Sequence, residues 1–188
     1  VDAIIIKYTV ITGSYCRFHY IIELFGLLCD HFQITDPKTG ESFTNFIIKK
    51  GDLMIGDRGY GSITGINHVI DNNGDYLVRI RNKAFKIMKN ESEEFSLLEN
   101  FRSLDYGEIG DFDLFYYSSK HKMRNLRLCV VKKSPEAAKY SKEASIKTMK
   151  RKQRTVNDET VELYAYFFVI TSITRTVLSA VALLAIYR

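Results

Sequence analysis

Short runs of β-branched and aromatic residues, separated by turn residues, fill the first 80 positions and restrict the chain to a strand-rich fold. The runs are Val1 to Tyr8, Arg17 to Leu24, Leu27 to Thr35, Asp52 to Gly56 and Tyr76 to Ile80. Their lengths and flanking turn residues are typical of strands. One helix is expected among them, from Ser62 to Ile70, because isoleucines recur there at helical spacing and Ser62 can cap the first turn. This order of elements predicts an α/β fold.

The rest of the chain changes character after Ile80. The segment from Arg81 to Tyr117 is polar and acidic, and its strand candidates are short. The later elements that the patterns predict are strands at 113–117, 126–131 and 161–173, a basic helix at 137–153 that starts after Pro135, and an apolar helix at 176–187.

Charge and cysteine content narrow the classes of protein. The net charge of +5 and the pI of about 9.0 are compatible with nucleic-acid binding but do not establish it. Three cysteines without paired spacing argue against a disulfide framework, so we expect a reducing, cytoplasmic setting. The apolar stretch from Val161 to Tyr187 leaves a membrane-anchored basic protein open. Glu162 and Arg175 interrupt that stretch, which favours two elements of a water-soluble core and no membrane contact.

Two carboxylates, Asp2 and Asp57, each flank an apolar strand. A carboxylate beside buried strands is costly to desolvate unless it is paired or bound to a metal. A divalent cation such as Mg²⁺ takes oxygen ligands, and pairs of such ions catalyse phosphoryl transfer. The spacing alone leaves the simpler interpretation open, because an aspartate next to a strand is most often a turn or surface residue.

Several short motifs resemble the core of bacterial insertion-sequence DDE transposases, and most closely the insertion-sequence-four group. The most specific is Asp57-Arg58-Gly59-Tyr60 after an apolar strand. The others are Val1-Asp2-Ala3, Gly13-Ser14 followed by Arg17-Phe18-His19-Tyr20, Ile34-Thr35-Asp36 with Gly40-Glu41-Ser42, and Tyr187-Arg188. The group carries a signature of Tyr, Arg, Glu and Lys, and Tyr187 resembles its first residue.

The resemblance implies a fold, a site and a cofactor. The fold is α/β, with a ribonuclease H-like core and a β-rich insertion, truncated before the helix that carries the third carboxylate. The core would occupy residues 1–80 and 161–188, and the insertion residues 81–160. Asp2 and Asp57 would be the first two catalytic residues and would bind Mg²⁺ or Mn²⁺. The Arg, Glu and Lys of the signature would follow Arg188, so we expect the 188-residue chain to be inactive alone.

The implied partner is DNA, both transposon ends and target, and the full-length protein is expected to form a homodimer associated with the bacterial nucleoid. Arg58 is a candidate phosphate ligand, although pairing with a nearby carboxylate is an alternative. The candidate DNA-binding residues on the basic helix are Lys147, Lys150, Arg151, Lys152 and Arg154. A solvated helix face is the alternative for them.

Two further alternatives remain. The chain can be a non-catalytic, DNA-binding remnant of a decayed transposase gene. The pairs Cys16 with His19 and Cys29 with His31 suggest a zinc site, but their irregular spacing on predicted strands favours ordinary packing.

Overall fold

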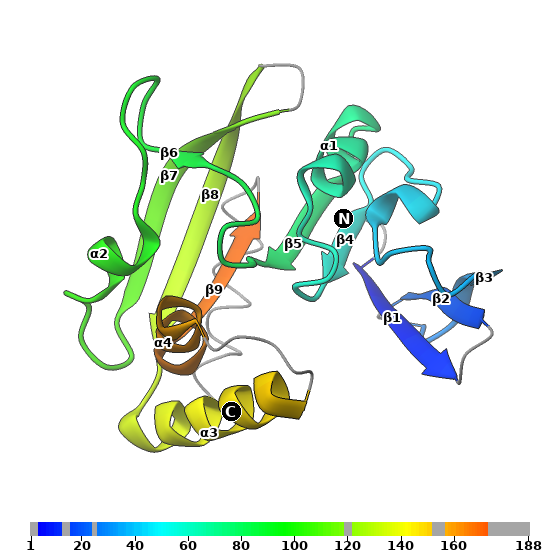
Figure 1. The fold of residues 1–188 in the computed structure, drawn as a ribbon. Coiled ribbons are helices and arrows are strands. Elements are labelled where there is room, and N and C mark those ends of the chain that lie inside the picture. The colour runs from blue at the N-terminus through cyan, green and yellow to red at the C-terminus, as the bar shows by residue number, and fades with distance from the viewer. Residues whose placement is uncertain (1–3, 13–15, 24–25, 119–121, 152–156, 173–188) are drawn as a thin grey trace. The chain divides into compact units, whose positions relative to one another are not determined.

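The computed structural model describes residues 4–12, 16–23, 26–118, 122–151 and 157–172. These residues divide into two compact units (Figure 1). Unit 1 comprises Val1–Phe85 with Ser118–Lys122, and unit 2 comprises Lys86–Tyr117 with Met123–Arg188. Helices and both parallel and antiparallel strands occur, which confirms the expected α/β class. No helix among the described residues is long and apolar enough to cross a membrane.

Unit 1 is built on five strands in the order β3-β2-β1-β4-β5. The strands are β1 (Ile4–Thr12), β2 (Cys16–Glu23), β3 (Cys29–Thr35), β4 (Leu53–Gly56) and β5 (Asp75–Arg79). β1, β2 and β3 pair antiparallel, whereas β4 lies parallel to both β1 and β5. All five predicted strands are therefore confirmed, with shifts of a few residues at their ends. A short 3-10 helix, η1 (Phe43–Asn45), precedes β4.

Helix α1 (Ile63–Asp71) follows β4 and is confirmed together with its cap. The Ser62 hydroxyl accepts a hydrogen bond from the backbone N–H of Gly65 at 3.1 Å. Asn73 adopts a φ of 58° just after the helix, a left-handed conformation that asparagine tolerates. Ile66 and Val69 are fully buried, so the apolar face of α1 forms part of the core of this unit.

The cap of α1 provides a first prediction about stability. We expect Ser62→Ala to lower the free energy of unfolding by about 1 kcal/mol, because the N–H of Gly65 loses its acceptor. Urea denaturation followed by circular dichroism measures the change. The matched control is Ser96→Ala, because Ser96 caps helix α2 (Leu97–Phe101) without a side-chain hydrogen bond. Equal losses for the two variants would contradict the prediction.

Unit 2 is built on four strands in the order β9-β8-β7-β6. Its elements are β6 (Ile87–Met88), α2, β7 (Ile109–Tyr117), β8 (Met123–Lys132), α3 (Pro135–Arg151), α4 (Asp158–Tyr166) and β9 (Phe167–Ser172). All its strand pairs are antiparallel. The predicted strand within β8 and the helix that begins at Pro135 are confirmed, and β7 starts four residues before the predicted Asp113.

The prediction of one strand from Val161 to Ile173 is wrong in its first part. Residues up to Tyr166 form helix α4, and only Phe167–Ser172 form a strand. The Asn157 side chain accepts from the N–H of Thr160, and Asp158 and Glu159 lie in the first turn, where acidic residues favour a helix. These capping interactions outweigh the β-propensity of the aromatic residues that follow. Ile170 is buried as expected, whereas Leu184 and the predicted helix at 176–187 lie outside the described residues.

Candidate functional site

Asp57 stands where the chain leaves β4. Leu53 and Met54 of that strand are buried, whereas Asp57 itself is exposed. Its Oδ1 accepts a hydrogen bond from the backbone N–H of Gly59 at 2.8 Å, and its carbonyl oxygen accepts from the N–H of Tyr60 at 3.1 Å. The Tyr60 ring is 2% exposed and packs against Phe43 with a centroid distance of 5.3 Å. A buried aromatic ring therefore anchors the turn that presents the Asp57 carboxylate to solvent.

A second carboxylate, that of Glu41, reaches the same turn from the loop before η1. Gly59 makes this approach possible. A Cβ at residue 59 would lie 1.7 Å from Glu41 Oε2 and 3.1 Å from Asp57 Oδ1. The two carboxylates consequently lie close together beside one glycine. Two ionised carboxylates this close together repel each other, and a bound cation would reduce that repulsion.

The sequence interpretation did not assign Glu41 to the site. It appeared only within the motif Gly40-Glu41-Ser42, far from Asp57 along the chain. The approach of Glu41 to Gly59 depends on how the loop after β3 folds back over the end of β4. The periodicity of strand residues does not predict the path of such a loop.

The geometry around Gly59 predicts a specific coupling. Gly59→Ala should lower the free energy of unfolding by about 1 kcal/mol, because the new methyl group displaces the flexible end of Glu41. The same substitution in a Glu41→Ala background should be less destabilising, since the displaced carboxylate is then absent. A double-mutant cycle by urea denaturation measures the difference. Additive effects of the two substitutions would show that Glu41 does not occupy this space in solution.

Two arginines belong to the same region: Arg58 lies within the turn, and the Arg81 side chain reaches it. Arg58 is half-buried, and its carbonyl oxygen accepts a hydrogen bond from the Arg81 guanidinium at 3.3 Å. Arg81 also reaches the carbonyl oxygen of Gly59 at 3.5 Å, a long and weak contact. Arg81 follows β5 and was not among the predicted site residues. The parallel pairing of β4 and β5 brings it beside Asp57, because both strands end at the same edge of the sheet.

Two of the predicted site residues, Asp2 and Tyr187, lie outside the described residues. The strand that follows Asp2, β1, is the direct parallel neighbour of β4, with Ile4 opposite Leu53. Leu53 is the first residue of β4, whereas Asp57 follows the last residue of that strand.

The predicted DNA-binding residues of the basic helix belong to unit 2. Lys147 and Lys150 are exposed on α3, which ends at Arg151. Lys152 and Arg154 lie outside the described residues, as does the side chain of Arg151.

The residues considered for zinc belong to β2 and β3. His19 is fully buried, and its Nε2 lies 2.8 Å from Thr35 Oγ1. His31 packs edge-on against Phe46, while Cys29 is exposed. Within the part of the chain that the structure describes, no three His, Cys, Asp or Glu residues gather closely enough to hold a metal ion.

Comparison with known proteins finds relatives of one kind. The chain is 28% identical over 162 residues to the transposase for insertion sequence element IS421 of Escherichia coli. The same identity and length are found with InsL of the insertion sequence elements IS186A and IS186B of Escherichia coli strain K12. Each alignment covers 84% of this chain and 44% of the relative, so the chain spans less than half the length of these proteins. No family model and no solved structure matches the chain. The resemblance to insertion-sequence transposases is confirmed by these relatives.

Proposed function

We propose that the chain is the part of an insertion-sequence DDE transposase that carries the first two metal-binding carboxylates, Asp2 and Asp57, on a ribonuclease H-like core. The observation that carries the proposal is the position of Asp57 at the carboxyl end of β4, in a sheet ordered β3-β2-β1-β4-β5. The similarity to the IS186 and IS421 proteins supports the same assignment. The substrate would be DNA at transposon ends and target sites.

The donor groups at this site fit a hard divalent cation such as Mg²⁺ or Mn²⁺. Oδ1 of Asp57 accepts a hydrogen bond from the Gly59 N–H, whereas Oδ2 accepts none from a described residue. Ions bound there would activate a water or hydroxyl oxygen and stabilise the leaving oxygen of a phosphodiester. Asp57 would hold the ion, and Arg58 would contact a phosphate oxygen. For Asp2 to share the ion, the chain before Ile4 must bring it to the carboxyl end of β4.

Metal-directed cleavage tests this site without requiring turnover. Fe²⁺ with ascorbate and peroxide should cut the polypeptide next to the bound ion, near residues 41 and 57. Asp57→Asn should lower this cleavage at least about fivefold, because a neutral amide binds divalent cations poorly. Glu99→Gln is the control, since Glu99 is an exposed carboxylate on α2. Unchanged cleavage near residue 57 in Asp57→Asn would refute the metal site.

A second proposal, DNA binding without chemistry, is supported by the exposed lysines of α3. A protein of this kind would bind DNA but would not nick it at any Mg²⁺ or Mn²⁺ concentration. Nicking of supercoiled plasmid by a full-length protein that contains residues 1–188 therefore separates the two proposals.

A further inference from the structure

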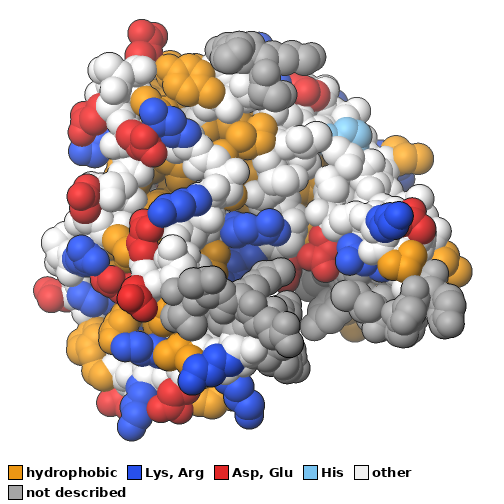
Figure 2. Space-filling model, in the orientation of Figure 1, with side chains coloured by type: hydrophobic (Ala, Val, Ile, Leu, Met, Phe, Trp, Pro, Cys, Tyr) orange, Lys and Arg blue, Asp and Glu red, His pale blue; other side chains and the backbone are white. Residues whose placement is uncertain are grey.

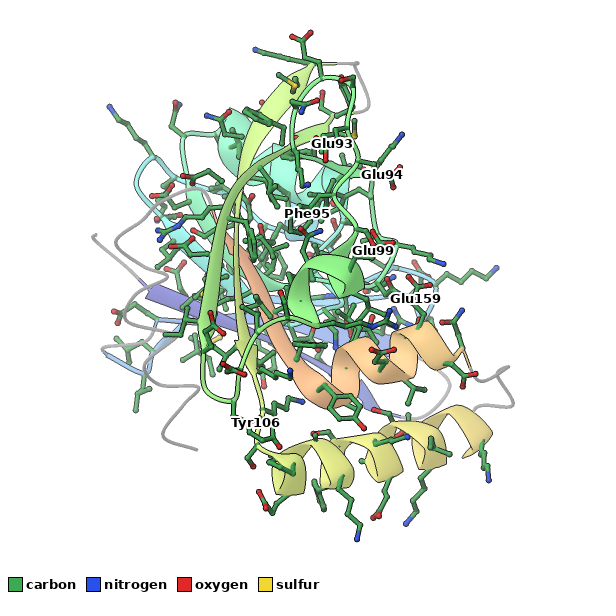
Figure 3. The ribbon with its side chains drawn as sticks, turned by 90° about the vertical axis from the view of Figure 1, so that its left-hand side faces the viewer. Glu93, Glu94, Phe95, Glu99, Tyr106 and Glu159 are labelled. Atoms are coloured by element: carbon green, nitrogen blue, oxygen red, sulfur yellow. The ribbon has the colours of Figure 1, made fainter. Side chains whose placement is uncertain are left out.

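A cavity of about 430 Å³ lies in unit 2, where the ends of several elements meet. Helix α4 contacts both α2 and α3 and lies between them (Figure 1, Figure 3). Residues from the end of α2, the end of β8, α3, α4 and the start of β9 line the cavity. Its volume is within the range of about 300–1,000 Å³ that is typical of sites for small molecules.

Part of the cavity lining is apolar. Val161 and Phe167 are buried residues of the core of unit 2, and both reach the cavity. Tyr166 lines it as well and is partly exposed to solvent. An apolar group of a ligand that covers these side chains would release water from them, which favours binding.

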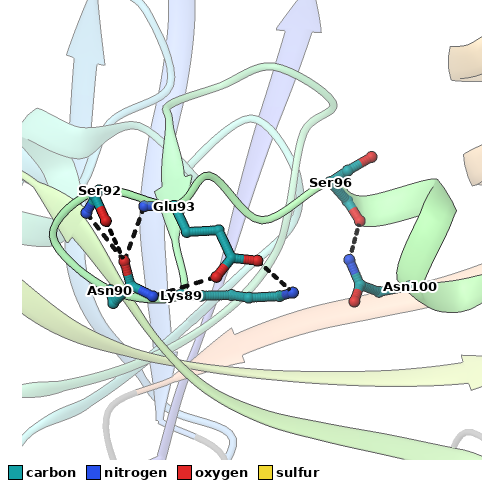
Figure 4. Close-up of polar contacts among 6 residues, drawn as sticks. All are labelled: Lys89, Asn90, Ser92, Glu93, Ser96 and Asn100. Carbon is teal, nitrogen blue, oxygen red and sulfur yellow. Dashed lines mark hydrogen bonds and ion pairs between the residues drawn. The ribbon is translucent and has the colours of Figure 1, made fainter.

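Three of the charged groups at the cavity are occupied by local contacts. Arg102 forms two hydrogen bonds with Glu162, at 2.8 and 2.9 Å, and this contact lowers the pKa of the Glu162 carboxyl, which therefore stays ionised and paired. Lys132 Nζ donates to the carbonyl oxygen of Arg102 at 3.3 Å. Local pairing of this kind also occurs before α2, where Lys89 Nζ lies 2.8 Å from Glu93 Oε1 (Figure 4).

The other two charged groups at the cavity, those of Lys142 and Asp158, are not occupied in this way. Lys142 reaches the cavity from α3, and Asp158 reaches it from the first turn of α4. Both residues are exposed, and neither side chain is hydrogen-bonded or ion-paired to a described residue. Glu159, the next residue on α4 (Figure 3), does not line the cavity. Side chains of both charges are interspersed with apolar ones around α3 and α4 (Figure 2).

We propose that this cavity binds a small zwitterion with an apolar side chain, an apolar α-amino acid. The carboxylate of the ligand pairs with Lys142, and its ammonium pairs with Asp158. Its side chain packs against Val161, Tyr166 and Phe167. A ligand with a single charge leaves one of the two protein groups unpaired, and both ion pairs are stronger in a partly enclosed site than in bulk water.

A titration that follows the amide chemical shifts of the protein containing residues 1–188 tests this proposal, with L-phenylalanine as the ligand. The largest shift changes should occur at residues that line the cavity, such as Val161 and Phe167. L-Phenylalaninamide lacks the carboxylate and N-acetyl-L-phenylalanine lacks the ammonium. Each should bind about threefold more weakly than phenylalanine, as expected for the loss of one partly exposed ion pair. The buffer must be acidic enough to keep the amine of phenylalaninamide protonated.

Substitutions in the protein should reproduce the changes in the ligand. Lys142→Gln should weaken the binding of phenylalanine about threefold but leave that of phenylalaninamide unchanged, because the amide has no carboxylate to pair with Lys142. Asp158→Asn should weaken phenylalanine to the same extent and leave N-acetylphenylalanine unchanged. The matched controls are Lys147→Gln on the same helix and Glu99→Gln in the same unit. Neither residue lines the cavity, so neither variant should alter binding.

The comparison of the three ligands needs no variant, and the amide spectrum of each variant shows that it is folded. Failure of phenylalanine to bind, or equal affinities for the three ligands, would overturn the proposal. Equal weakening by Lys142→Gln and Lys147→Gln would do the same. Asp57 belongs to unit 1, and Asp57→Asn should bind phenylalanine as the parent does. Failure of the catalytic proposal is therefore distinguishable from failure of this one.

Discussion

Asp57→Asn should reduce Mg²⁺-dependent DNA nicking at least about 1,000-fold, which corresponds to about 4 kcal/mol of transition-state stabilisation. The measurement is plasmid nicking by a full-length transposase that contains residues 1–188. Asparagine matches aspartate in shape, and its amide oxygen can still accept from the Gly59 N–H, so the turn should persist. The lost negative charge weakens binding of the divalent cation, and the reacting phosphate then loses its main electrostatic partner.

The controls for nicking use the same protein and plasmid. Glu99→Gln removes a carboxylate from unit 2 and should nick at the parental rate. Nicking that is unaffected by Asp57→Asn would place the catalytic residues elsewhere.

The strands of unit 1 and helix α1 could be predicted because local chemistry determines them. Ser62 caps α1, Asn73 supplies the left-handed residue after it, and β4 is an apolar run that ends in a glycine. The same local signals placed Asp57 at a strand end. The partner of each strand could not be predicted from these local signals, because the parallel register of β1, β4 and β5 depends on contacts between distant segments.

Contacts between distant segments account for what the sequence did not predict at the candidate site. Glu41 and Arg81 both reach the Asp57 turn, one from the loop after β3 and the other from the end of β5. Neither residue lies near Asp57 along the chain, and neither has a local pattern of its own. The reason for a glycine at residue 59 is likewise structural, because a side chain there would collide with the Glu41 carboxylate.

Helix α4 shows how local signals can compete. Its aromatic and β-branched residues favour a strand, whereas Asn157 and the acidic residues after it favour a helix start. The cap determines the first nine residues, and strand propensity determines the six that follow, where β9 pairs with β8. The orientation of the lysines on α3 was also beyond prediction, because a basic helix has no apolar stripe strong enough to identify its inner face.

Phe101→Ala should be the most destabilising single substitution considered for unit 2, lowering its free energy of unfolding by about 3–5 kcal/mol. Phe101 is 0% exposed, and its ring lies 6.2 Å from that of Phe95, 5.9 Å from that of Phe112 and 5.5 Å from that of Phe167. These rings come from α2, the segment before it, β7 and the start of β9. Truncation therefore leaves a cavity where four segments meet, and it also removes the tilted contacts between the Phe101 ring and its three neighbours.

Guanidinium denaturation followed by far-ultraviolet circular dichroism measures the loss. Phe101→Leu should recover most of the stability, because leucine keeps an apolar side chain in the same space. Tyr106→Ala is the matched control: Tyr106 is an aromatic residue of the same unit that is 56% exposed, so its truncation should change the free energy of unfolding by less than about 0.5 kcal/mol. If Phe101→Ala were no more destabilising than Tyr106→Ala, the four rings would not form the core of unit 2. Its antiparallel sheet would then have to be stabilised chiefly by other buried residues, such as Leu128 and Leu163.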